Sequence, residues 1–305
     1  MKTEIEISKL TLGTVQLGLP YGIANKGGQP DLQSSHQLLQ FALKSGINTL
    51  DTARDYGEAE DVIGSFPDAA KFNIVSKFKL SDAALQNKAL AIQEATASVE
   101  KSCKTLKIDK VPVCLLHKNM QQDMEATARM LPQVLDELEK EGLIATGGIS
   151  VYTPQELQFI RNWDSIRAVQ VPVNVFDTRV LQNNIMQTLI DNNVNVFARS
   201  VYLQGLVVMA EDNLPSNLSF TRPFLSGLRE IAAEAGLSAK EFAFAFVRDM
   251  PGITSLVVGV ETISQIQENV SLLQLPTLSS DIYLKVREQF LDMPVKVITP
   301  ALWNN

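Results

Sequence analysis

Eight short apolar runs, separated by longer segments of helical periodicity, constrain the fold of this chain more than any other feature. The runs lie at residues 10–15, 47–52, 72–78, 111–117, 143–149, 168–173, 194–199 and 253–260. Continuous apolar runs predict strands that are buried on both faces, and therefore a parallel sheet covered by helices. Eight strand and helix units close most naturally into a (β/α)8 TIM barrel. An open, doubly wound sheet is the alternative.

The segments between the runs carry helix signals. Between the third and fourth runs, apolar side chains recur at steps of three and four residues, at Ile92, Ala95, Val99 and Cys103. This spacing predicts one apolar stripe on a helix, with Cys103 packing in the core. The first long helix has Asp31, Ser34 or Ser35 to cap its start and Gly46 to end it.

Composition excludes several classes of function. The 34 acidic residues outnumber the 27 basic ones, which argues against a nucleic-acid partner. The segment Met1–Glu6 lacks the pattern of a secretory signal, and no apolar stretch reaches the length of a membrane span. Two cysteines, Cys103 and Cys114, are too few for a disulfide scaffold or a thiolate metal site. We therefore expect a cytoplasmic protein without a metal, folded as one domain over 1–305 with a C-terminal extension at about 275–305.

Polar residues stand at or just after the ends of three predicted strands. Asp51 and Tyr56 follow the second run, Lys77 ends the third, and His117 ends the fourth. In a barrel of this kind the working residues come from the C-terminal ends of the strands, so these four side chains should meet at one rim. The other histidine, His36, lies near a helix start, where we expect a solvent-facing role.

Sequence motifs in the same order make the chain similar to the aldo-keto reductase superfamily over nearly its whole length. They are Leu12-Gly13-Thr14, Asp51-Thr52-Ala53, Tyr56-Gly57, Ala59-Glu60, Ile63-Gly64, Lys77, Leu116-His117, Gly148-Ile149-Ser150, Gln170 and Glu268-Asn269. The resemblance implies an eight-stranded barrel that binds a nicotinamide cofactor without a Rossmann domain, in agreement with the missing G-x-G-x-x-G pattern. It also implies NAD(P)H-dependent reduction of an aldehyde or ketone.

The resemblance assigns roles to the four rim residues. Tyr56 corresponds to the general acid, Lys77 and Asp51 to its supporting ion pair, and His117 to the group that orients the carbonyl. The ordinary pKa of a tyrosine is about 10, and we expect the Lys77 ammonium to bring the pKa of Tyr56 down towards the working range.

Further residues correspond to the cofactor site. The resemblance places Ser150 and Gln170 at the nicotinamide carboxamide and Glu268 and Asn269 at the adenine. The other predicted cofactor contacts are Gly13, Thr14, Arg199, Ser200, Gly259 and Gln265. Two positions depart from the family pattern: Val151 replaces an asparagine, and Arg199 stands where many members stack an aromatic ring on the nicotinamide. The guanidinium can stack there instead or bind the pyrophosphate, and the sequence leaves both roles open.

The residues after the eighth run bear on cofactor choice. Residues 257–265 hold no Lys or Arg, and Glu261 would repel a 2′-phosphate, whereas helix amides beginning near Thr262 can bind one. Family habit favours NADP(H) and the local charge favours NAD(H). We expect NADP(H) by a small margin.

The loops expected around the rim bear on the choice of substrate. Loop 16–30, with Gln16 and Tyr21, should overhang the rim beside His117, together with Lys118, Asn119 and the tail around Trp303. Their polarity predicts a small polar or sugar-like carbonyl compound. A Schiff-base aldolase using Lys77 and a non-enzymatic, cofactor-binding regulatory subunit are the alternatives, whereas the specificity of the four rim residues argues against a purely structural role. The oligomeric state stays open.

Overall fold

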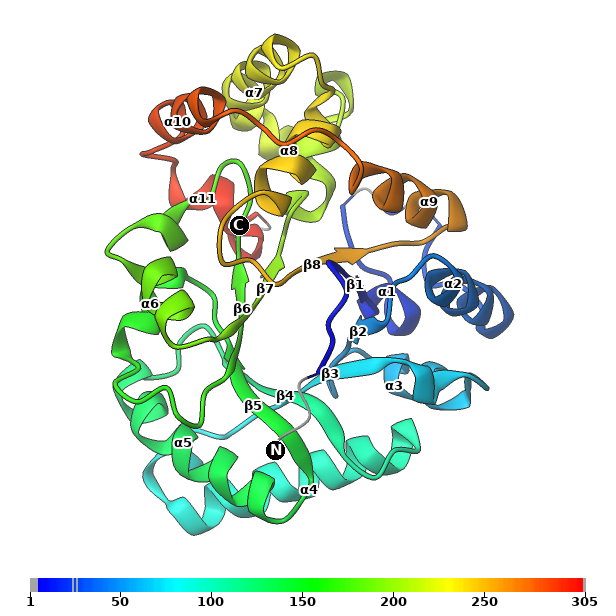
Figure 1. Ribbon diagram of the computed structural model, residues 1–305, viewed down its shortest axis with the longest axis vertical. Coiled ribbons are helices and arrows are strands. Elements are labelled where there is room, and N and C mark those ends of the chain that lie inside the picture. Colours follow the sequence, from blue (N-terminus) through cyan, green and yellow to red (C-terminus); the bar gives the residue numbers. More distant parts are fainter. Residues whose placement is uncertain (1–4, 24, 26, 304–305) are drawn as a thin grey trace.

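Eight parallel strands form a closed barrel in the computed structural model, which describes residues 5–23, 25 and 27–303 (Figure 1). The strands are β1 (Leu10–Gly13), β2 (Thr49–Asp51), β3 (Asn73–Phe78), β4 (Val111–His117), β5 (Ile144–Ser150), β6 (Ala168–Pro172), β7 (Asn195–Arg199) and β8 (Ser255–Gly259). Each lies within or overlaps a predicted run, and β1 pairs with β8, so the barrel is confirmed and the open sheet is wrong. Residues 1–4, which were expected not to form a secretory signal, and residues 24 and 26 of the predicted rim loop lie outside the described residues.

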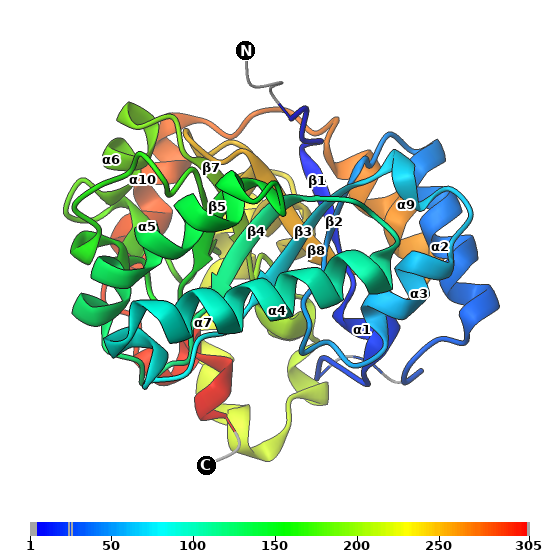
Figure 2. The same ribbon diagram turned by 90° about the horizontal axis from the view of Figure 1, so that it is seen from below.

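Helices surround the barrel and cover its strands. They are α1 (Val15–Gly18), α2 (Leu32–Lys44), α3 (Ala59–Ser65), α4 (Lys88–Leu106), α5 (Met124–Lys140), α6 (Ile185–Asp191), α7 (Arg222–Glu234), α8 (Ala239–Arg248), α9 (Ile263–Leu272), α10 (Ser280–Gln289) and α11 (Val295–Ile298). In the side view of Figure 2, the described chain begins before β1 at one end of the barrel and finishes after α11 at the other.

Local signals act as predicted at the first long helix. The side chain of Asp31 accepts a hydrogen bond from the Ser34 amide, and Gly46 adopts a φ of +82° just past the helix end. In α4, the stripe packs inward, with Ala95 and Val99 buried and Cys103 half-buried. His36 differs from its prediction, because its Nε2 lies within hydrogen-bond distance of Ser65 and the side chain is half-buried between α2 and α3.

The interior of the barrel is built in layers. A small apolar cluster fills its middle, formed by Val75, Val113, Leu115, Ala168 and Phe197. Side chains alternate between the two faces of a strand, so residues two positions further along point to the same side. This alternation puts Lys77, His117, Gln170 and Arg199 directly after the apolar layer, at the C-terminal end of the barrel. The sequence period thus explains why polar groups gather at that rim.

The C-terminal segment packs against the outside of the barrel. The ring of Tyr283 in α10 stacks on Phe246 in α8 with 4.4 Å between centroids, and Phe290 meets Phe176 edge-on at 4.9 Å. Trp303 is buried, and its indole donates a hydrogen bond of 2.8 Å to the Lys296 carbonyl.

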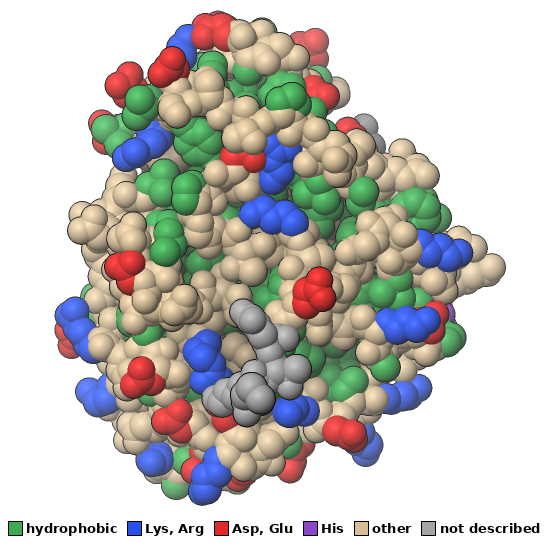
Figure 3. Space-filling view, viewed as in Figure 1, with side chains coloured by type: hydrophobic (Ala, Val, Ile, Leu, Met, Phe, Trp, Pro, Cys, Tyr) green, Lys and Arg blue, Asp and Glu red, His purple; other side chains and the backbone are tan. Residues whose placement is uncertain are grey.

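The helices of the described residues fall short of the requirements of a membrane span, and one face of the molecule carries charges of both signs (Figure 3). None of the helices in residues 5–23, 25 and 27–303 combines the length and apolar character needed to cross a bilayer. On the face seen in Figure 3, acidic and basic side chains are interspersed.

Candidate active site

Lys77 lies at the centre of the site. Its ammonium donates to Asp51 Oδ1 at 2.7 Å, to the Thr52 carbonyl at 2.9 Å and to the Tyr56 hydroxyl at 3.4 Å. These three contacts use all three donors of the amine. Because Lys77 is only 2% exposed, the ion pair with Asp51 compensates for a charge that burial would otherwise make costly.

Close backbone packing fixes the loop that carries Tyr56. A Cβ atom on Gly18 would lie 1.8 Å from the Tyr56 carbonyl oxygen, and Gly57, at φ +55°, packs against the Gly18 carbonyl. An ion pair also holds this loop: the buried Glu60 binds the half-buried Arg54 and accepts a hydrogen bond of 2.7 Å from Ser76. Glycines at 18 and 57 therefore set the approach of the phenol to Lys77.

Burial dominates the titration of the phenol. It raises the pKa of Tyr56 above its ordinary value of 10.0, and the nearby Lys77 charge offsets only part of this effect. The predicted net lowering of the Tyr56 pKa is wrong, although Lys77 acts in the predicted direction. Burial by itself would lower the pKa of Lys77, but Asp51 and Tyr56 raise it above 10.5, so the amine stays protonated. At neutral pH the site holds a phenol and an ammonium.

His117 stands beside the phenol. Its ring meets the Tyr56 ring edge-on with 6.1 Å between centroids, and its Nδ1 lies 3.9 Å from Asp55 Oδ2. Burial, followed by the Lys77 charge, lowers the pKa of His117 to about 3. The imidazole is therefore neutral at neutral pH and offers one N–H donor.

Gln170 connects the ion pair to β5. Its Nε2 donates to Asp51 Oδ1 at 2.6 Å, and its Oε1 accepts from the Ser150 hydroxyl at 3.3 Å. Asp51 Oδ1 thus receives hydrogen bonds from both Lys77 and Gln170. Through Asp51, the predicted carboxamide contacts Ser150 and Gln170 are therefore linked to Lys77.

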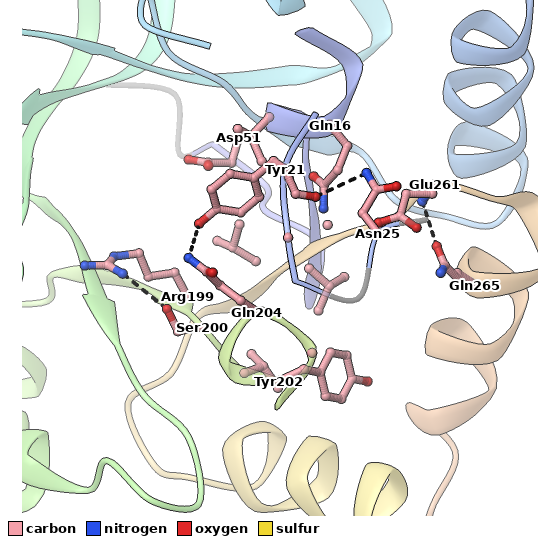
Figure 4. A pocket seen from close by; sticks show the side chains of 18 of the residues that line it. Gln16, Tyr21, Asn25, Asp51, Arg199, Ser200, Tyr202, Gln204, Glu261 and Gln265 are labelled. Carbon is pink, nitrogen blue, oxygen red and sulfur yellow. Dashed lines mark hydrogen bonds between the residues drawn. The ribbon is translucent and has the colours of Figure 1, made fainter. Parts of the chain in front are cut away.

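A cavity of about 260 Å³ begins at this group and extends towards β8 and α9; we call it the long cavity (Figure 4). The predicted cofactor contacts that line it are Gly13, Thr14, Gln170, Arg199, Ser200, Gly259, Gln265 and Asn269. Ser150 lies in an adjoining cavity, and Glu268 is exposed and lines neither. Gln16 also lines the long cavity, and its buried Oε1 has no hydrogen-bond partner among the described residues. The walls therefore combine apolar surface with hydrogen-bonding groups of the kind that a dinucleotide uses.

Some residues that line the long cavity were not predicted from the sequence. Lys240 of α8 lines the long cavity, forms an ion pair with Glu268 and lies 5.7 Å from the centroid of the Tyr202 ring. The Tyr202 hydroxyl donates to Asn269 Oδ1 at 2.8 Å. Residues 257–265 hold no cation, whereas Lys240 of the preceding helix lines the same cavity as Glu261 and Gln265.

The start of α9 is already capped. The Gln265 side chain accepts hydrogen bonds from the amides of Glu261 and Thr262, at 2.6 and 3.3 Å, and the Thr262 hydroxyl accepts from the Gln265 amide. This capping box uses amides that the sequence suggested for a phosphate. A phosphate at those amides would have to displace the Gln265 side chain.

Two further cavities share Tyr21, Tyr152 and Arg199 in their walls, and the inner one reaches Tyr56. The inner cavity, about 260 Å³, is lined by Tyr56, His117, Ser150, Tyr152 and Arg199, among others. The outer cavity, about 440 Å³, lies between the Tyr21 loop and the C-terminal tail with Trp303. Tyr21 lines all three cavities, and its hydroxyl accepts a hydrogen bond of 2.9 Å from Gln204.

Lys118 does not overhang the rim as predicted. It is 1% exposed, forms an ion pair of 2.9 Å with Glu156 and donates to the Asn119 carbonyl at 2.7 Å. The sequence could not show this, because Glu156 lies in the following strand-to-helix loop. Lys118 ties the loop after β4 to the loop after β5.

Comparisons with known proteins agree with this geometry. Residues 9–288 match the model of the Aldo/keto reductase family, and the chain belongs to that family. It is accordingly an oxidoreductase of the NAD(P)H-dependent class, acting on small carbonyl compounds.

Individual relatives are distant. The chain is 24% identical over 328 residues to the L-glyceraldehyde 3-phosphate reductase of Escherichia coli, with 93% of this chain and 91% of that protein covered. It is 23% identical over 293 residues to a probable voltage-gated potassium channel subunit beta of Oryza sativa, covering 85% and 88%. The glycerol dehydrogenase AKR11B4 of Gluconobacter oxydans has a similar fold, with a TM-score of 0.73 at 20% identity over 96% of this chain and 95% of that one.

Proposed function

We propose that the protein reduces an aldehyde or ketone to the alcohol, with Tyr56 donating the proton to the carbonyl oxygen. A bound reduced nicotinamide dinucleotide supplies the hydride. Tyr56 is a phenol at neutral pH, since burial keeps its pKa above the ordinary value of 10.0, and so it holds the proton that reduction requires. As the proton leaves, the Lys77 ammonium 3.4 Å away stabilises the phenolate, and Asp51 keeps that ammonium charged and oriented. The neutral His117 offers an N–H to orient the carbonyl.

The contact between Lys77 and Tyr56 carries this proposal and weakens the aldolase alternative. An amine that attacks a carbonyl must be unprotonated, which usually requires a lowered pKa. Lys77 has the opposite environment, because Asp51 and the phenol raise its pKa and three acceptors occupy its protons. Borohydride trapping should therefore leave no substrate bound to Lys77.

For the cofactor we propose NADP(H), with Gln170 and Ser150 at the carboxamide and Asn269 at the adenine. Lys240 supports this choice, since it supplies a cation to the part of the long cavity that Glu261 and Gln265 also line. Its present partner, Glu268, is exposed, and an exposed ion pair contributes only about 0–1 kcal/mol, so a phosphate can compete for the amine.

For the substrate we propose a small polar, sugar-like carbonyl compound, and for the location the cytoplasm. The name of the Escherichia coli relative supports a sugar-like substrate. The neutral polar groups of Tyr21, Tyr152 and Gln204 around the outer cavity support it too.

A regulatory subunit that binds cofactor without turnover is the second candidate, favoured by the rice relative. A screen of aldehydes and ketones, followed at the absorbance band of the reduced nicotinamide with each dinucleotide in turn, separates the two. Reduction that Tyr56→Phe abolishes supports the reductase. Tight dinucleotide binding without turnover of any carbonyl supports the regulatory subunit.

A further inference from the structure

Arg199 occupies an unusual position for a charged residue. It ends β7, two residues after Phe197 in the apolar layer, so its side chain enters the interior of the barrel mouth. One guanidinium nitrogen donates to the Val151 carbonyl at 3.0 Å and the other to the Ser200 hydroxyl at 3.2 Å. The guanidinium carbon also lies 5.9 Å from the centroid of the Tyr152 ring. Neutral groups thus hold the side chain in place.

No carboxylate balances its charge. Every other half-buried arginine in the described chain pairs with an acid: Arg54 with Glu60, Arg167 with Glu139, Arg179 with Asp177, Arg229 with Glu211, and Arg248 with Asp249. Arg199 has only a carbonyl and a hydroxyl as acceptors among the described residues. A half-buried guanidinium without a counter-ion has unused capacity to bind an anion.

The surroundings isolate this charge. Arg199 is the one charged residue among the described residues that line the inner and outer cavities; the rest are apolar, aromatic or neutral polar. His117, in the inner cavity, is neutral at neutral pH. A ligand that enters from the outer cavity towards Tyr56 therefore meets a single, uncompensated positive charge.

The direction of the side chain separates this charge from the far end of the long cavity. In Figure 4 the guanidinium points away from Glu261 and Gln265. Its contacts with Val151 and Tyr152 belong to the loop after β5, beside the inner cavity. Arg199 lines the near part of the long cavity as well, but this orientation disfavours the pyrophosphate role that the sequence left open and turns the charge towards the inner cavity.

We propose that the substrate carries an anionic group, a carboxylate or a phosphate, in addition to its carbonyl, and that this group binds the Arg199 guanidinium. The inference rests on the proposed reductase function and narrows its substrate class. A guanidinium binds both anions through paired N–H donors, so the two share one chemistry. Tyr21 lies in the same cavities with its hydroxyl oxygen already accepting from Gln204, which leaves its proton free to donate to the anion.

Matched pairs of substrates test this proposal. Succinic semialdehyde and butanal have the same chain length and differ in the carboxylate, whereas glyceraldehyde 3-phosphate and glyceraldehyde differ in the phosphate. For wild type we expect kcat/KM to favour the anionic member of at least one pair by roughly 10- to 100-fold, as one charge-assisted contact predicts. The pair with the larger ratio identifies the anion.

Arg199→Leu should bring that ratio close to one, and Arg199→Lys should restore part of it. Arg161→Leu, which changes an exposed arginine outside all three cavities, should keep the wild-type ratio. A wild-type ratio near one, or a ratio that survives in Arg199→Leu, overturns the proposal. So does a loss of dinucleotide affinity in Arg199→Leu without a change in the ratio, because Arg199 would then serve the cofactor.

A binding measurement keeps the two proposals separable. Titration calorimetry of succinate and of inorganic phosphate into the protein with saturating oxidised dinucleotide requires no turnover. Binding of either anion by wild type that is lost in Arg199→Leu supports the anion site even if no aldehyde is reduced. Absence of anion binding, together with reduction of neutral aldehydes, overturns the anion site and leaves the reductase function standing.

Discussion

Gln170 Nε2 donates a hydrogen bond of 2.6 Å to Asp51 Oδ1, the same oxygen that accepts from Lys77. The sequence suggested Gln170 only as a contact of the nicotinamide carboxamide. The structure links it to the ion pair behind Tyr56, so one side chain joins the cofactor cavity to the acid–base group.

Removal of this amide should destabilise the fold. Gln170→Leu deprives a buried carboxylate of a charge-assisted donor, and we expect the free energy of unfolding to fall by roughly 1.5–3 kcal/mol. Urea denaturation measures this change. Gln187→Leu is the control, because it removes an exposed hydrogen bond to Asp191 and should cost less than about 1 kcal/mol. An equal decrease in the free energy of unfolding for the two variants would show that the hydrogen bond to Asp51 stabilises the fold no more than an exposed one.

Lys77 should control the alkaline limb of the pH profile. Wild-type reduction should slow at alkaline pH as Tyr56 loses its proton, and the Lys77 charge lowers the pKa at which this happens. Lys77→Met should reduce turnover by roughly 10²–10⁴ and move the alkaline limb to higher pH. The measurement is kcat/KM between pH 6 and 11 with saturating cofactor, and we expect the variant to stay level at the alkaline end, where the wild type begins to fall. An unchanged limb in the variant would assign that ionisation to another group.

His117 should make the free energy of unfolding depend on pH in the acidic range. Its pKa is about 3 in the folded protein and about 6.5 in an unfolded chain, so the unfolded state binds more protons between these values. Stability is then fully present above pH 6.5 and decreases as the pH falls, by about 1–2 kcal/mol between pH 6.5 and 5.

The comparison of wild type with His117→Gln by urea unfolding at pH 7.5 and 5 isolates this contribution, because other titrating groups cancel. We expect the stability difference between the two proteins to shift in favour of the variant at pH 5. A difference that does not depend on pH would mean that His117 keeps an ordinary pKa in the fold.

Lys240 should discriminate between the two dinucleotides. Lys240→Met should weaken NADPH binding by roughly tenfold and leave NADH binding nearly unchanged, because only the 2′-phosphate uses the charge. Quenching of protein fluorescence gives both dissociation constants without turnover. Lys285→Met removes a more exposed ion pair, with Glu234, outside the cavities and should change neither constant. Equal weakening for both dinucleotides would assign Lys240 to the shared adenosine part.

The sequence predicts the barrel well because each strand is a continuous apolar run and the first long helix has its own end signals. Asp51, Lys77 and His117 are predictable for the same reason, since their place at strand ends follows from the strand assignment. Tyr56 follows from its motif, but its close approach to Lys77 depends on the packing of Gly18 on Gly57, which no local pattern reveals.

The features that the sequence missed are contacts between distant segments. Lys118 is buried because Glu156, 38 positions later, pairs with it, and Lys240 reaches the long cavity because α8 packs beside α9. The pKa of Tyr56 was predicted from one charge at short range. Its direction depends instead on the burial of the whole ring, which only the assembled barrel determines.

Single-turnover reduction by Tyr56→Phe tests the central claim most directly. The variant and wild type are each saturated with reduced dinucleotide and mixed with an aldehyde that wild type reduces, and the absorbance of the reduced nicotinamide is followed. Tyr283→Phe, which alters a phenol in α10 outside all three cavities, is the control. We predict that Tyr56→Phe slows the step by roughly 10²–10⁴ with the dinucleotide dissociation constant unchanged. A rate equal to that of wild type would contradict the assignment of Tyr56 as the proton donor.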